Sequence, residues 1–131
     1  EAPFLEAITV DPNNKWFFAY DNVLYRGSIG NPEELVGVPR AIKGSIAIIN
    51  GLSQIPSWSF SNCTNLVSVT IPASVNSVGS LAFNWCENLT DITFQGTIAQ
   101  WKEIKLSRSW KSNVPAIIVH CIDGDVQAKR Y

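Results

Sequence analysis

The chemistry that this sequence could support begins with a histidine beside a cysteine. His120 is the only histidine, and Cys121 follows it directly. An imidazole can activate a thiol only if the two groups meet. The run PAIIVHCIDGD is typical of a strand and turn, and consecutive strand side chains point to opposite faces. A catalytic triad or a zinc site would also need further histidine or cysteine. We therefore expect no catalytic residues, no metal site and no cofactor.

The three cysteines leave two interpretations open. Cys63 and Cys86 occupy equivalent positions of an internal repeat, each between a phenylalanine and a leucine. If they lie in neighbouring coils about 4.8 Å apart, the distance permits a disulfide. Side chains that run parallel into a core favour two free thiols instead. Cys121 is expected as a free, partly buried thiol, since an odd number argues against a closed disulfide framework.

The five tryptophans are the candidate aromatic anchors for a ligand. Trp85 aligns with a polar repeat position, so we expect it to be exposed. Trp58 aligns with a leucine, and Trp101 would lie on the inner face of a helix, so we expect both in the core. Trp16 and Trp110 fit either environment. Trp85 and Trp110 are therefore retained as possible anchors.

A 23-residue repeat determines where these side chains lie. Apolar residues recur at this spacing through the middle of the chain: Phe60 and Phe83, Cys63 and Cys86, Leu66 and Leu89, Val69 and Ile92, Ile71 and Phe94. A fixed period predicts stacked coils that bury their apolar faces against each other. The alternating runs LVSVTIP and LTDITFQ predict one strand per coil, which Pro72 ends because it has no N–H. Val75 and Val78 then point inward on an irregular or 3₁₀ return path.

The strand residues between the inward positions must face solvent. In neighbouring coils they would form a flat polar strip across a parallel sheet, and this strip is the candidate ligand-binding surface: Ser45, Ser68, Thr70, Asp91 and Thr93, with Ala47, Ala7 and Thr9 at equivalent positions. A solvated sheet face without a ligand explains the same pattern. Small hydroxyl groups supply few of the aromatic or arginine anchors that dominate binding energy.

Both ends of the chain depart from the regular repeat. The N-terminal run LEAITV resembles a repeat strand, with three inward residues: Leu5, Ile8 and Val10. The run KWFFAYDNVLYRG predicts an extended piece folded back at Asp21-Asn22. Toward the C-terminus, Thr97 and Gln100 predict a capping box for a short helix. This helix and the following strand would cover the last coil, whose apolar side chains would otherwise meet water.

The composition excludes several classes of partner. The net charge is −1, so no strong field would attract nucleic acid or an anionic membrane. No apolar run approaches the roughly 18 residues of a membrane span. The chain starts at Glu1 and contains no methionine, so we expect a mature protein or an excised piece whose signal peptide has been removed.

The repeat unit FSNCTNLVSVTIPASVNSVGSLAFNWCENLTDITF resembles the BspA-like class of leucine-rich repeat. The N-terminal LEAITVDPNNKWFFAYDNVLYRG is similar to a variant unit of that family, and the C-terminal run from FQGTIAQWKEI to IVHCIDGD resembles its end segment. The resemblance implies a bacterial cell-surface or secreted protein that binds extracellular-matrix or microbial surface proteins. The family has no shared catalytic residues.

These observations give one expected architecture. We expect a single domain over residues 1–131, with a variant N-terminal unit at 1–45, regular repeats at 46–96 and a cap at 97–131. The fold would be a leucine-rich-repeat solenoid of about four to five coils, mostly β with irregular or 3₁₀ return segments and one short capping helix. The expected function is a non-catalytic protein-binding or adhesion module. A structural spacer or terminal repeat, and a carbohydrate-binding module with exposed tryptophan, are the alternatives.

Overall fold

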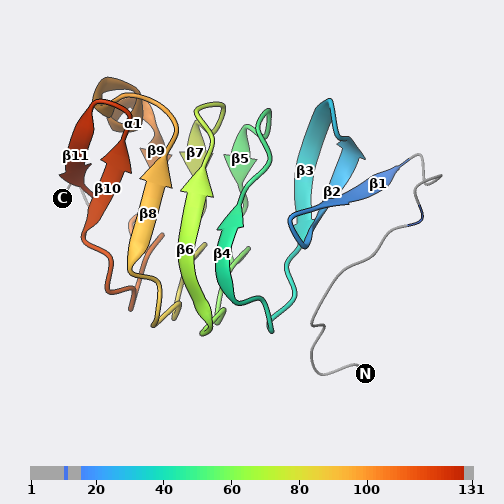
Figure 1. The fold of residues 1–131 in the computed structure, drawn as a ribbon, viewed down its shortest axis with the longest axis horizontal. Coiled ribbons are helices and arrows are strands. Elements are labelled where there is room, and N and C mark those ends of the chain that lie inside the picture. Colours follow the sequence, from blue (N-terminus) through green and yellow to red (C-terminus); the bar gives the residue numbers. More distant parts are fainter. Residues whose placement is uncertain (1–10, 12–15, 129–131) are drawn as a thin grey trace.

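The computed structural model describes residues 11 and 16–128, which form a β-solenoid with a sheet across each broad side (Figure 1). The front sheet has the strand order β11-β10-β8-β6-β4. Its strands are β4 (Gly44–Ala47), β6 (Leu66–Ile71), β8 (Asp91–Phe94), β10 (Ile118–Cys121) and β11 (Gly124–Gln127). The back sheet pairs β5 (Gln54–Ile55), β7 (Ser77–Val78) and β9 (Lys105–Leu106) in parallel.

The register of the front sheet confirms the 23-residue repeat. Ile46 pairs with Val69, and Val69 pairs with Ile92, in parallel ladders. The described residues make about three coils, fewer than the four to five expected. The difference arises because the N-terminal unit forms a separate antiparallel sheet and the C-terminal segment forms a hairpin. The back sheet was not predicted, since two-residue strands leave no recognisable alternation.

The core follows the predicted columns of apolar side chains. Phe60 and Phe83 stack with ring centroids 4.9 Å apart and planes 7° from parallel. Cys63 and Cys86 are buried free thiols beside this column, and the Cys86 thiol donates to the Phe60 carbonyl oxygen over 3.0 Å. Hydrogen bonding with Cys63, together with burial, raises the pKa of Cys86 far above its usual range. Both sulfurs therefore serve as small core side chains.

The return path from the back sheet to the front sheet is a chain of turns rather than a 3₁₀ helix. In the second coil, Ala82 N–H donates to Gly79 O, and Cys86 N–H donates to Phe83 O. Hydrogen bonds also join each turn to the next coil, as from Phe60 N–H to Ala82 O over 2.7 Å. Stacked turns therefore carry hydrogen bonds between coils wherever the sheets do not.

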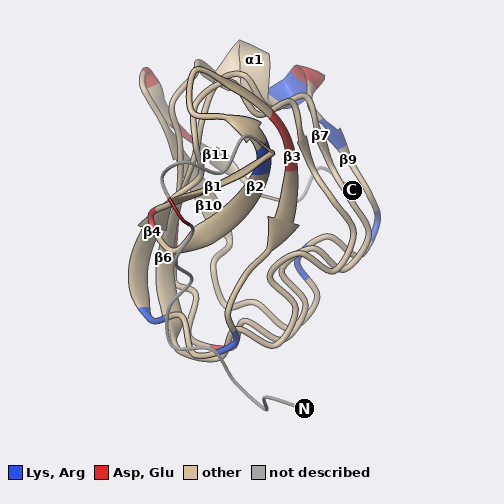
Figure 2. Ribbon diagram, turned by 90° about the vertical axis from the view of Figure 1, so that its right-hand side faces the viewer, with Lys and Arg blue, Asp and Glu red and all other residues tan. Residues whose placement is uncertain are grey.

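An antiparallel N-terminal sheet covers one end of the solenoid (Figure 2). It consists of β1 (Phe17–Tyr20), β2 (Val23–Ser28) and β3 (Asn31–Gly37). Asp21 and Asn22 have φ values of 47° and 67°, so the predicted fold-back is confirmed as a tight hairpin turn. Val23, Tyr25 and Leu35 are buried against the first coil. The predicted inward residues of the preceding run lie outside the described residues, as do two of the outward positions: Leu5, Ala7, Ile8, Thr9 and Val10.

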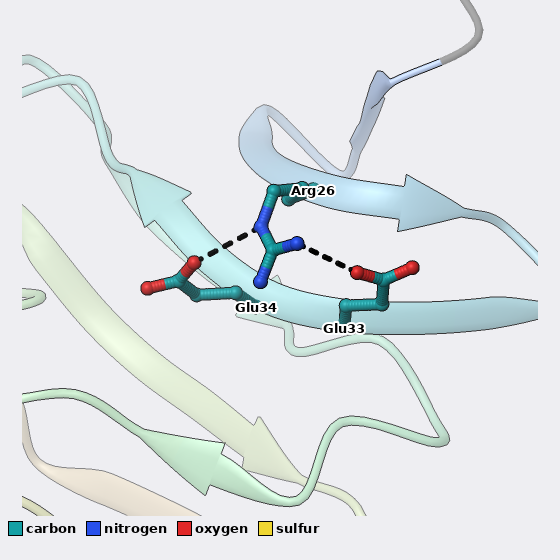
Figure 3. A network of polar contacts seen from close by, with 3 residues as sticks. All are labelled: Arg26, Glu33 and Glu34. Carbon is teal, nitrogen blue, oxygen red and sulfur yellow. Dashed lines mark hydrogen bonds and ion pairs between the residues drawn. The ribbon is translucent and has the colours of Figure 1, made fainter.

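An ion-pair cluster joins two strands of the N-terminal sheet (Figure 3). Arg26 on β2 contacts Glu33 over 2.7 Å and Glu34 over 3.2 Å, both on β3. All three side chains are about half exposed, so these pairs contribute little to stability. The cluster lies beside irregularities in the β2–β3 register.

A helix and a hairpin cover the other end. Helix α1 (Ile98–Glu103) begins with the predicted capping box, in which Gln100 N–H donates to the Thr97 hydroxyl and Thr97 N–H donates to the Gln100 side chain. Trp101 on this helix is buried, as expected. The antiparallel pair β10–β11 then completes the front sheet. The last segment is therefore a hairpin, not the single strand and turn that the sequence predicted.

Two tryptophan environments differ from expectation or resolve an ambiguity. Trp58 is 58% exposed, so its predicted core position is wrong. Its repeat equivalent, Leu81, is itself only half-buried, and both residues have left-handed backbone at a corner of the coil. Trp110 is fully buried, in edge contact with Phe83 and Trp101. An anchoring role for Trp110 is therefore wrong, because the irregular last coil turns its indole into the core.

Gly79 is required by the close approach of two coils. A Cβ atom at Gly79 would overlap the backbone nitrogen of Ser57 and lie 2.8 Å from its Cα. We predict that Gly79→Ala lowers the free energy of unfolding by about 1–3 kcal/mol, because the backbone of the neighbouring coil must move. Urea denaturation measures this change. Gly30→Ala is the control, since a Cβ at Gly30 meets nothing within 4 Å. Equal stability of the two variants would contradict the close packing.

Candidate functional site

The front sheet aligns its outward side chains in two rows. One row runs across five strands, through Ala47, Thr70, Thr93, His120 and Asp125. The other aligns Ser45, Ser68 and Asp91. We call these eight residues the strip. The structure brings all five predicted strip residues together, because each alternates with an inward core residue.

His120 and Asp125 were not included in the predicted strip. They face each other across the β10–β11 hairpin, with His120 Nδ1 2.8 Å from Asp125 Oδ1 and both side chains about half exposed. Val119 lies further along the chain from its partner Ile92 than one repeat length, so the repeat could not place this strand. The alternation of apolar Val119 with polar His120 in the sequence predicts that His120 points outward, but it does not predict which strand β10 joins. The strip thus ends in an imidazole–carboxylate pair.

The adjacent His120 and Cys121 do not meet in the structure. His120 and Cys121 lie on opposite faces of β10, and Cys121 is half-buried. Burial, with Asp123 and Asp125 nearby, raises the pKa of the Cys121 thiol above its usual range. A thiol with a raised pKa forms little of the reactive thiolate at neutral pH. Among residues 11 and 16–128, no three histidine, cysteine or acidic side chains are grouped as metal ligands.

Side chains from the N-terminal hairpin cover the free edge of β4. Ala47 N–H donates to Asp21 Oδ2 over 2.6 Å, and Ile49 N–H donates to the Tyr25 hydroxyl over 3.1 Å. Burial raises the pKa of Tyr25 to about 12. An uncovered edge strand is an open template for pairing with other chains. These two acceptors therefore close part of the edge without adding another strand.

A hollow of about 570 Å³ lies where the strip meets this edge. Its lining is both polar and apolar and comes from the hairpin turn, the loop before β4, β4 itself and the next coil: Asp21, Asn22, Ala41, Ile42, Lys43, Ser45, Ile46 and Asn65. Ser45 belongs to both the hollow and the strip. A ligand on the strip could therefore place a polar side chain into the hollow.

Asp91 and Asp125 are the two acidic residues of the strip, and its eight residues include no tryptophan. Figure 2 shows acidic and basic residues on the strands of the N-terminal sheet as well as on loops. Trp85 is 48% exposed, as expected, but it lies on the turn between β7 and β8 rather than on the front sheet. Within the part of the chain that the structure describes, no helix has the length and apolar character of a membrane span.

Comparison with known proteins agrees with the repeat and the sheet register. A profile of the BspA type leucine rich repeat region (6 copies) matches residues 42–113, more than half of the chain. The chain belongs to the BspA-type leucine-rich repeat family. The matched range contains the three coils that the described residues of this BspA-type protein form, from just before β4 to just after β9. A search of curated proteins finds no match.

One solved structure is similar to this BspA-type protein. It is the crystal structure of a leucine rich cell surface protein from Faecalibacterium prausnitzii A2-165. The sequence identity is 21% and the TM-score is 0.48, over 76% of this chain and 44% of that chain. The chain thus covers less than half the length of the solved protein.

Burial of the Tyr25 hydroxyl at the β4 edge should make the folded protein less stable at alkaline pH. The pKa of Tyr25 in the folded protein is about 12, above the value of about 10 expected when unfolded. The folded state therefore holds this proton more tightly, and its stabilising effect is complete below pH 10. We predict that about 2–3 kcal/mol of folding free energy is lost as the pH rises from 10 through 12.

The measurement is urea denaturation at several alkaline pH values, with Tyr25→Phe beside the wild type. The variant should be less stable at neutral pH by about 1–3 kcal/mol, since Ile49 N–H loses its acceptor. Its free energy of unfolding should not show the part of the decrease between pH 10 and 12 that comes from ionisation of Tyr25. Parallel pH profiles of wild type and Tyr25→Phe would show that the hydroxyl is not buried.

Proposed function

We propose that this domain is a non-catalytic binding module that recognises another protein through the strip on its front sheet. The observation that carries the proposal is the continuous register across five hydrogen-bonded strands. It holds eight outward side chains on a rigid support. Membership of a leucine-rich repeat family supports a protein ligand. We infer that the module acts at the bacterial cell surface or outside the cell, on an extracellular-matrix or microbial surface protein.

The strip would bind a partner through hydrogen bonds whose formation costs little side-chain conformational entropy. Thr70 and Thr93 have few χ1 rotamers, and serine side chains are short, so a bound partner immobilises little that was free. Asp91 and Asp125 add two carboxylates, and the eight residues include no lysine or arginine. The preferred partner surface would therefore offer lysine, arginine or amide donors. Five strands about 4.8 Å apart provide roughly the width of one standard interface, about 800 Å² per partner.

The covered ends of the core argue against a spacer inside a longer repeat array. Such a spacer would present open coils to its neighbours on both sides. Here the N-terminal sheet covers one end, and α1 with the β10–β11 hairpin covers the other. A terminal repeat remains compatible with this arrangement. We therefore favour the binding module over the internal spacer.

The test is surface plasmon resonance of the domain against immobilised collagen, laminin and fibronectin and against whole bacterial cells. We predict saturable binding by the wild type. The double variant Thr70→Lys/Thr93→Lys should bind at least about ten-fold more weakly, because two cations replace two hydroxyls in the centre of the strip.

The matched control is Gln54→Lys/Ser77→Lys, which makes the same change in charge at two paired positions of the back sheet. It should bind like the wild type. Equal loss in both double variants would show a general charge effect and exclude the strip as the site. Wild-type protein that is folded but binds none of these surfaces would favour the structural role instead.

A further inference from the structure

The first strand of the front sheet has a row of backbone N–H groups along its free edge. In a parallel ladder, successive N–H groups point alternately to the two sides of a strand. Gly44 and Ile48 donate to carbonyl oxygens of the next coil over 3.1 and 3.0 Å. The N–H groups of Ser45, Ala47 and Ile49 therefore point the other way, to the free edge of the sheet.

The chain itself shows which acceptors suit this edge. Ala47 N–H donates to the Asp21 carboxylate over 2.6 Å, and Ile49 N–H donates to the Tyr25 hydroxyl over 3.1 Å. A hydrogen bond from a backbone N–H to a carboxylate is charge-assisted, so it is stronger than one between neutral groups. Among the hydrogen bonds of the described residues, the hairpin supplies no acceptor to Ser45 N–H. Ser45 therefore keeps a donor that a ligand can use.

Two cations lie beside this donor. Ser45 and Lys43 both line the hollow of about 570 Å³ at the β4 edge. A second hollow of about 360 Å³ adjoins it, since Ala41 and Asn65 line both, and Arg40 lines the second. Both cationic residues are exposed, and neither forms an ion pair with another described residue. The donor and the two cations therefore line one continuous depression.

The balance of charge around the depression favours an anion. Its lining contains one carboxylate, that of Asp21, which is already engaged by Ala47 N–H and is outnumbered by the two cations. Asp91 of the strip lies two strands away from Ser45 in the same row, or about 9–10 Å. This distance exceeds the Debye length of about 8 Å at physiological ionic strength, so the repulsion from Asp91 is largely screened.

Ser45 lies both on the strip and in the depression, so a protein on the strip would also reach the depression. We propose that the depression binds an acidic segment of that protein, with one carboxylate on Ser45 N–H beside Lys43 and further acidic groups toward Arg40. The ligand carboxylate would use the β4 edge as Asp21 does two residues further along the strand. This proposal rests on the proposed function, to which it adds the chemistry and the orientation of the partner.

Opposite charges at the two ends of the strip would orient the partner. Lys43 and Arg40 lie at the β4 end, whereas Asp91 is on β8 and Asp125 is on β11. A partner whose acidic segment enters the depression places its basic side chains toward these two carboxylates. The reversed orientation brings like charges together, which weakens binding.

The test is a nuclear magnetic resonance titration of the isotope-labelled full chain with a blocked peptide of alternating glutamate and glycine, acetyl-EGEGE-amide. We expect saturable binding with a dissociation constant of about 1 mM or tighter. The amide signals of Ser45 and Asn65 should shift during the titration. The matched glutamine peptide should bind at least about ten-fold more weakly, because it keeps the backbone and loses the charges.

Three variants of the protein test the assigned groups. Lys43→Gln should weaken binding of the glutamate peptide about three-fold or more, because an exposed cation beside the carboxylate is lost. Asp21→Asn should strengthen it about two-fold or more, since a like charge is removed and the amide oxygen can still accept from Ala47. Lys105→Gln removes a cation from the back sheet and should bind like the wild type. The amide spectrum of each variant checks that it is folded.

No saturable binding by the wild type, equal binding of the glutamine peptide, or unchanged binding by folded Lys43→Gln would overturn the proposal. Equal binding of glucuronate would assign the depression to sugar acids and would overturn it too. The titration needs no matrix protein, so it separates this site from the strip. Binding of a matrix protein through the strip without binding of the glutamate peptide would overturn this site alone. Binding of the peptide by a chain that recognises no matrix protein or cell would support the site and contradict the proposed function.

Discussion

The structure depends on the parallel hydrogen-bonded stacking of coils that follow a 23-residue repeat. This stacking aligns Ile46, Val69 and Ile92 in one apolar column and Phe60 with Phe83 in another. Because strand side chains alternate with a period of two, the same register that buries these columns also aligns the outward strip. A slip of one residue would expose the core and bury the hydroxyls together. The packing of the core thus determines which side chains point outward and form the candidate binding surface.

Stacking leaves apolar side chains and backbone N–H and C=O groups uncovered at the two ends of the three described coils. A different element covers each end. At the first coil, the antiparallel hairpin buries Tyr25 and supplies side-chain oxygens to the N–H groups of Ala47 and Ile49. At the last coil, a capped helix buries Trp101, and a hairpin provides the final strand of the front sheet. Both solutions satisfy edge groups that would otherwise favour aggregation.

At the corners of the coils, the fold restricts the residue type less than it does in the core. The backbone must become left-handed there, as it does at Asn62, Trp85 and Asn113, but the side chain then points toward solvent and its type can change. Inward positions are occupied mostly by apolar residues, which must fill the core closely. Differences between coils therefore concentrate at the corners and on the outward strip.

Much of the architecture could be predicted because its signals are local or periodic. The inward columns, the strand ends at Pro72, the hairpin turn at Asp21-Asn22 and the capping box at Thr97 all follow from neighbouring residues or a constant spacing. The buried Trp110 and the pair of His120 with Asp125 could not be placed, since the last coil is longer and breaks the regular period.

Sequence alone thus determined the family, the repeat and the five hydroxyl or carboxylate residues of the strip. Only the tertiary structure decided that Trp58 is exposed and Trp110 buried. Alignment of repeats shows that Trp58 corresponds to Leu81, but a left-handed corner turns both side chains away from the column that the alignment predicts. The orientation of a side chain depends on backbone dihedral angles and on the neighbouring coil, and neither is present in a single repeat.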